Sequence, residues 1–148
     1  MMQGNGQGFC RLLKIEPQAA HLARVRQFVE EVAQEAAPNL NPERLFDLKV
    51  AVSEACANAI EHAGDCTSYL EVCATLKGGR LTFTVTDTGL FRPPCLSRET
   101  CHSRGLGLPL MVALMDEVQF SRVPQGGTAV SLSIFVDPVA SDRIPQQT

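Results

Sequence analysis

The sequence lacks several features that would assign it to a specialised class of protein. Its six cysteines form no CxxC pair and no ladder of metal ligands, and no apolar signal segment precedes them, so we expect free thiols in a reducing cytoplasm. The longest apolar run, 108–115, contains a proline and is far shorter than the roughly 20 residues that cross a bilayer. The sequence therefore predicts a cytoplasmic protein without a membrane anchor.

Positive charge is also scarce. Thirteen Lys and Arg stand against sixteen Asp and Glu, for a formal net charge of −3, so no basic field favours direct contact with nucleic acid. A protein or a small molecule is the expected partner. The 148 residues, 45% of them hydrophobic, predict a single compact domain. We place it at 9–136, with disordered polar tails at 1–8 and 137–148.

Hydrophobic periodicity and breaker residues predict eight elements in the order β-α-α-β-β-α-β-β. The second helix should begin with Asn41 as its cap and Pro42 in its first turn, and end at Gly64. A glycine turn at 78–79 joins two alternating strands, which is typical of a hairpin. The predicted elements are a strand at 9–15, a helix between Pro17 and Pro38, a helix at 42–63, strands at 68–76 and 80–87, a helix at 105–117, and strands at 117–123 and 128–136.

Clusters of strands interspersed with helices favour an α+β fold over repeated βαβ units. We therefore expect a two-layer α/β sandwich, in which helices cover one face of a mixed sheet. Between the two hairpins, residues 88–104 lack periodicity and carry glycine and two prolines. A connection of this length is usually functional in a compact domain, so it is a candidate lid.

A polar stripe runs along the second predicted helix, where Glu54, Asn58 and His62 recur every fourth residue. Residues four apart share one face of a helix, so these side chains form a ridge. Taken alone, the spacing is better explained by an ordinary solvated helix face. A zinc site through Glu54 and His62 is a weaker alternative, because it offers few ligands.

Two further motifs follow the stripe. Asp87 closes a strand before Thr88 and Gly89, and taken alone this motif is better explained by a simple turn. Gly105 and Gly107 open a helix, where backbone N–H groups can approach a phosphate. A loop that needs positive φ would use the same glycines, and the pattern is not that of a Walker loop.

Taken in order, four motifs are more specific than any one of them. They are E-x-x-x-N at 54–58, D-x-G at 87–89, G-x-G-L at 105–108 and G-G-T at 126–128. This order resembles the Bergerat fold of the histidine-kinase-like ATPase superfamily. "VAVSEACANAIEHAG", "RGLGLPLMVALMDEV" and "GGTAVSLSIFV" are most similar to the anti-sigma factor serine/threonine kinases. The resemblance covers about 9–136 and leaves no space for the dimerisation helices of a histidine kinase.

The resemblance implies a role for each matching residue. Asn58 would ligate the Mg²⁺ that bridges the phosphates of ATP, and Glu54 would act as the general base. Asp87 would accept a hydrogen bond from the adenine amine. The family pattern also implies that Gly89 and Thr128 contact the adenine, that the phosphates are contacted by Arg104, Gly105, Gly107 and Leu108, and that Arg24 contacts a protein partner.

Other residues near these motifs are weaker candidates for a functional role. His62 matches the family pattern, but capping or packing at the helix end is favoured over catalysis. An ordinary solvent-exposed arginine explains Arg24 as well as a partner contact does. Arg26 is a weaker candidate for a partner contact than Arg24. Cys95, Cys101 and His102 lie within the candidate lid, where chance placement is favoured over a metal or redox cluster because a fourth ligand is missing.

The function that the resemblance implies is that of an anti-sigma factor with ATP-dependent protein serine kinase activity. It would sequester a sigma factor, phosphorylate a small antagonist protein and form a homodimer. The segment after Gly89 is shorter than in relatives, so a non-catalytic ATP-binding regulatory module stays open as the alternative. A metal-binding or thiol-redox domain built on the cysteines is a third hypothesis.

Overall fold

The computed structural model describes residues 9–63, 69–87, 107–123 and 127–136. Within them the order of helices and strands is the predicted β-α-α-β-β-α-β-β, with one additional 3-10 turn. The expected tails at 1–8 and 137–148 and the candidate lid at 88–104 lie outside the described residues. The elements are β1 Phe9–Ile15, η1 Ala19–His21, α1 Leu22–Ala36, α2 Pro42–Ala63, β2 Leu70–Lys77, β3 Arg80–Asp87, α4 Gly107–Leu114, β4 Glu117–Arg122 and β5 Thr128–Phe135.

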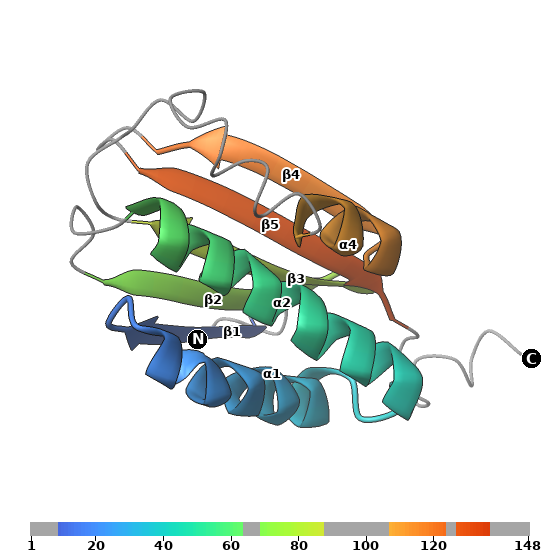
Figure 1. Ribbon diagram of the computed structural model, residues 1–148. Helices are drawn as coiled ribbons and strands as arrows, with labels where there is room; N and C mark the ends of the chain where they lie inside the picture. The colour runs from blue at the N-terminus through green and yellow to red at the C-terminus, as the bar shows by residue number, and fades with distance from the viewer. Residues whose placement is uncertain (1–8, 64–68, 88–106, 124–126, 137–148) are drawn as a thin grey trace, which may run out of the picture.

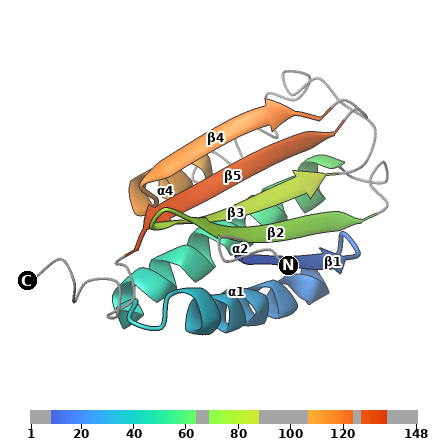
Figure 2. The same cartoon turned by 180° about the vertical axis from the view of Figure 1, so that it is seen from behind.

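The molecule has two layers, as the sequence predicts. Helices α1, α2 and α4 lie on one face of a five-stranded sheet, with α2 between the other two (Figure 1). The same sheet seen from behind has no described helix over it (Figure 2). The core fills the space between the layers, and its largest fully buried side chains include Phe83, Leu48, Leu70 and Leu81.

The sheet has the strand order β1-β2-β3-β5-β4. All four strand pairs among the described residues are antiparallel, so the expectation of a mixed sheet is wrong. The hairpin of β4 and β5 places β5 directly beside β3. β4 runs parallel to β3, but it lies one strand farther out and forms no ladder with it.

Helix α2 begins where the capping signal places it. Asn41 Oδ1 accepts a hydrogen bond from the backbone N–H of Arg44 at 2.8 Å, which satisfies one of the free donors of the first turn. Pro42 is the first helical residue, a position where its missing N–H costs nothing. The predicted start of this helix is therefore confirmed.

The first hairpin also follows its sequence pattern. Buried and half-buried residues alternate along β2 and β3, as expected for strands with one face against a core. Gly78 and Gly79 form the turn with φ angles of 57° and 79°, which only glycine adopts at little cost. This hairpin fixes the position at which β3 ends, and hence the position of Asp87.

Two pairs of hydroxyl groups join β3 and β5 on the helix-free face of the sheet. Thr82 Oγ1 lies 2.8 Å from Ser133 Oγ, and Thr84 Oγ1 lies 3.0 Å from Ser131 Oγ. Each pair joins directly opposite residues of β3 and β5, and such cross-strand pairs stabilise a sheet.

Among the helices that the structure describes, none is both long and apolar enough to cross a membrane.

Candidate functional site

The polar stripe of α2 lies at the boundary between core and solvent. Glu54 and Asn58 are both half-buried, while their neighbours Ala55 and Cys56 are buried against the sheet. Both residues also interact with other groups of the protein. The stripe is therefore not a fully solvated helix face. Of His62 the structure describes only the backbone, at the end of α2.

The end of β3 brings Asp87 beside Thr128, although 40 residues separate them in the chain. The two residues are direct partners in the β3–β5 ladder, and Arg122 of β4 is the partner of Thr128 on its other side. Because side chains alternate along a strand, Asp87 shares the helix-covered face with the buried Val85. The C-terminal half of α2, which carries Glu54 and Asn58, lies over this same end of the sheet (Figures 1 and 2).

Gly127 is the reason that β5 can start so close to Asp87. A Cβ atom at this position would lie 1.6 Å from the carbonyl oxygen of Asp87 and 2.8 Å from its carbonyl carbon. Both atoms belong to backbone held in the ladders with β2 and β5, so neither can move aside cheaply. Only glycine fits here. The motif G-G-T therefore includes a residue that sets the spacing of the two strands.

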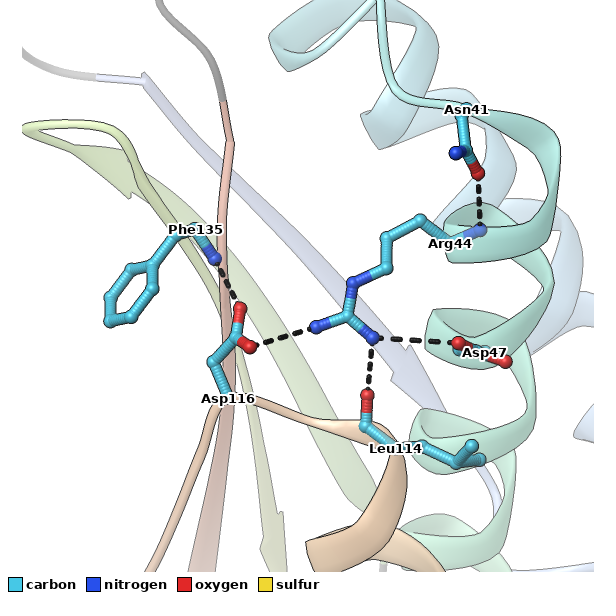
Figure 3. Close-up of polar contacts among 6 residues, drawn as sticks. All are labelled: Asn41, Arg44, Asp47, Leu114, Asp116 and Phe135. Atoms are coloured by element: carbon cyan, nitrogen blue, oxygen red, sulfur yellow. Dashed lines mark hydrogen bonds and ion pairs between the residues drawn. The ribbon is translucent and has the colours of Figure 1, made fainter.

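Helix α4 is fixed at its C-terminal end by Arg44 of α2 (Figure 3). The guanidinium donates to the carbonyl oxygen of Leu114 in the last turn of α4, and it pairs with Asp116 at 3.0 Å and with Asp47 at 3.4 Å. A cation at a helix C-terminus also interacts favourably with the helix dipole. Asp116 in turn accepts the backbone N–H of Phe135 at 2.8 Å. One side chain thus ties α2, α4 and β5 together.

Replacing Arg44 by methionine should lower the free energy of unfolding by about 1–3 kcal/mol, because a charge-assisted hydrogen bond and two ion pairs are lost together. Urea denaturation measures this change. The matched control is Glu35→Gln, which breaks a 2.9 Å pair with Arg11 whose side chains are 48% and 53% exposed. Such an exposed pair is worth less than about 1 kcal/mol. Equal losses in the two variants would contradict the role of Arg44.

The two arginines of α1 have different surroundings. Arg24 is exposed and lies 3.6 Å from Glu31 on the same helix. Arg26 donates to Ser53 Oγ at 3.3 Å and so reaches α2 one residue before Glu54. Both arginines are exposed, so a partner could reach either one, although Arg26 is also hydrogen-bonded to the neighbouring helix.

Several predicted site residues lie outside the part of the chain that the structure describes. Gly89, Arg104 and Gly105 are among them, as are Cys95, Cys101 and His102. Gly107 is the first residue of α4 and Leu108 the second, so both stand at the N-terminal end of that helix. Within the described ranges, no group of three or more His, Cys, Asp or Glu side chains could hold a metal ion.

The residue types gathered at this end of the sheet fit a magnesium–nucleotide complex. The amide oxygen of Asn58 is a suitable hard ligand for Mg²⁺, an ionised Asp87 can only accept hydrogen bonds, and the hydroxyl of Thr128 can donate or accept. Sequence reasoning did not single out Arg122 or Arg44. No local sequence motif marks either residue. Arg122 is placed by the pairing of β4 with β5, and Arg44 is placed by its contact with Leu114 in α4.

Comparisons with known proteins agree with this architecture. A family model described as the histidine kinase-like ATPase domain matches residues 15–134. The anti-sigma F factor of Pasteuria penetrans is 33% identical over 101 residues, which cover 61% of this chain and 67% of that protein. The serine-protein kinase RsbW of Bacillus subtilis is 29% identical over 151 aligned positions, covering 92% of this chain and 89% of that one.

A solved structure shares the fold at lower identity. The RsbU and RsbW domains of a Mycobacterium tuberculosis protein match with a TM-score of 0.61 and 23% identity, over 85% of this chain and 31% of that one. The family model spans most of the described strands and helices, and the resemblance found in the motifs is confirmed. The chain belongs to the histidine kinase-like ATPase family, in the branch that contains the anti-sigma factors and the RsbW serine-protein kinases.

Proposed function

We propose that this protein is an anti-sigma factor with ATP-dependent protein serine kinase activity. It binds ATP with Mg²⁺, sequesters a sigma factor, and phosphorylates a small antagonist protein on serine, acting as a cytoplasmic homodimer. The relatives with which it groups are named anti-sigma F factor and serine-protein kinase RsbW. One structural observation carries the proposal. The chain places Asp87 and Thr128 side by side at the end of the sheet over which Glu54 and Asn58 lie.

Each residue has a distinct task in the proposed reaction. The carboxylate of Glu54 takes the proton of the serine hydroxyl, whose oxygen then attacks the γ-phosphorus of ATP while the bond to the leaving ADP oxygen breaks. Asp87 and Thr128 hold the adenine, with Gly89 against its ring. When bound, Mg²⁺ neutralises phosphate charge, and Asn58 is the residue that would hold it.

The remaining contacts belong to the phosphates and to the partner proteins. Gly107 and Leu108 open α4, and with Arg104 and Gly105 they would present backbone donors and one positive charge to the phosphates. Arg24 is exposed on α1, the helix that lies on the opposite side of α2 from α4 (Figure 1). A protein partner could therefore contact Arg24 from solvent.

A transfer assay tests the proposal directly. The protein is incubated with γ-labelled ATP, Mg²⁺ and a candidate antagonist, and we expect the label on an antagonist serine. Tight ATP binding without any labelled serine would favour the non-catalytic regulatory module instead. That alternative rests on the segment after Gly89, which the family resemblance implies is shorter than in relatives. A pull-down of the sigma factor with and without ATP tests the binding function separately.

Asn58→Ala is expected to weaken Mg²⁺-dependent ATP binding by about 100-fold or more, since the ion loses its only proposed protein ligand and the phosphates lose their bridge. Isothermal titration with and without Mg²⁺ measures the change. The control is Asn39→Ala, an exposed asparagine in the turn before α2, which should leave the affinity unchanged. If Asn58→Ala binds ATP·Mg²⁺ like the parent protein, the assignment of the ligand is wrong.

A further inference from the structure

Two thiols lie together on the helix-free face of the sheet. The Sγ atoms of Cys10 in β1 and Cys73 in β2 are 3.9 Å apart, although the residues are 63 positions apart in the chain. Leu12 is the direct partner of Cys73 in the ladder, so the cysteines are diagonal neighbours on one face. Cys73 lies between the buried Val72 and Ala74, and its side chain therefore points away from the core.

The backbone holds this pair in place. β1 and β2 are paired over seven residues, from Phe9 opposite Leu76 to Ile15 opposite Leu70, so the two cysteines cannot drift apart while the sheet is intact. A disulfide bond is about 2.05 Å long, and closing it would require the sulfur atoms to approach by about 1.9 Å. Diagonal neighbours on adjacent strands have Cβ atoms farther apart than the roughly 3.5–4.5 Å that a disulfide requires, so closing the bond also needs a local shift of the edge strand β1 toward Cys73.

The two thiols differ in exposure. Cys10 is exposed, so an oxidant can reach it. Cys73 is half-buried, and burial, the neighbouring thiol of Cys10 and the carboxylate of Glu71 raise the pKa of Cys73 to about 11. Cys73 is therefore a neutral thiol at pH 7, and Cys10 is the sulfur that meets an oxidant first.

We propose that Cys10 and Cys73 form a reversible oxidation site that a peroxide closes to a disulfide. The sulfur of Cys10 attacks one peroxide oxygen, the O–O bond breaks, and a sulfenic acid and one water form. The sulfur of Cys73 then attacks the sulfur of Cys10, the S–O bond breaks, and a second water leaves with the thiol proton. Two thiols and one hydrogen peroxide thus give one disulfide and two waters, and a dithiol reverses the bond.

The disulfide would change the mechanics of the fold. It would tie the edge strand β1 to β2 and close a loop that contains α1 and α2, including the helix that carries Glu54 and Asn58. Closing a long loop restricts the unfolded chain more than the folded one. The oxidised protein should therefore unfold at a higher temperature than the reduced protein.

The test uses the full chain with Cys66, Cys95 and Cys101 replaced by serine, so that only Cys10, Cys56 and Cys73 remain. After hydrogen peroxide treatment, intact mass spectrometry should show a loss of about 2 Da, which dithiothreitol restores. Cys56 is an internal standard, because it is fully buried and burial raises the pKa of its thiol to about 12. Adding Cys56→Ser should leave the mass loss intact.

Single replacements test whether the mass loss requires both Cys10 and Cys73. In the same background, the 2 Da loss should vanish with Cys10→Ser and also with Cys73→Ser. In the Cys73→Ser variant, the exposed Cys10 should gain oxygen instead. Mass loss that survives either replacement would overturn the proposal. So would a covalent dimer on a non-reducing gel, or oxygen addition at Cys10 without any loss of 2 Da in the protein that retains both cysteines.

Discussion

Glu54→Gln is expected to lower the rate of serine phosphorylation by about 100- to 10,000-fold, which is the usual contribution of a general base. Glutamine has nearly the same shape and helix propensity, so α2 should keep its structure. It cannot accept the proton of the serine hydroxyl. ATP affinity should stay within about twofold of the parent value, because the proposed role of Glu54 lies in the transition state. Single-turnover transfer and ATP titration measure the two quantities separately.

Glu43→Gln is the matched control. Glu43 is an exposed carboxylate in the first turn of the same helix, about 16 Å along the helix axis from Glu54, and its replacement should leave the transfer rate unchanged. Full activity of Glu54→Gln would refute its assignment as the base. Loss of ATP binding together with transfer would show instead that Glu54 holds the nucleotide, and it would leave the kinase proposal standing.

Gly127→Ala is expected to destabilise the fold by about 3 kcal/mol or more, because the new methyl group would overlap backbone atoms that the sheet holds in place. The Cβ atom would lie 1.6 Å from the Asp87 carbonyl oxygen, so β3 and β5 must separate at the proposed adenine-binding end. For a domain of this size, the midpoint of thermal unfolding should fall by about 10 °C. Differential scanning calorimetry measures the change.

Gly78→Ala separates a steric clash from the general cost of replacing a glycine. Gly78 has a φ of 57° but nothing within 4 Å of its Cβ position, so alanine should cost only about 1 kcal/mol for the left-handed conformation. If Gly127→Ala proves no more harmful than Gly78→Ala, then β3 and β5 do not approach each other as closely as described.

Much of the fold could be predicted because its signals are local. The cap at Asn41 and the glycine turn at 78–79 lie within a few residues of the elements that they define, so both were identified correctly. The alternation along β2 and β3 follows from one buried face. The mixed sheet was wrong because strand partners are chosen over long distances. No local pattern indicates that β5, rather than β4, lies beside β3.

In the candidate site, too, only some features could be predicted from the sequence. The spacing of Glu54 and Asn58 on one helix face is a property of the sequence, since any α-helix brings residues four apart together. The order of the four motifs was enough to identify the family, and the family model confirms it. The roles of the individual residues stay predictions, and Gly89, Arg104 and Gly105 lie outside the described residues.

The sequence by itself determined the elements and the two-layer architecture, because helix caps, turns and hydrophobic periods act over a few residues. It determined the family through the order of its four motifs. Only the tertiary structure decided that Asp87 lies beside Thr128, that Gly127 must lack a side chain, that Arg44 caps α4, and that Cys10 meets Cys73. Each of these contacts joins residues at least 40 positions apart. They depend on which strands pair and how the helices pack, and the chain makes that choice only when the whole core is formed.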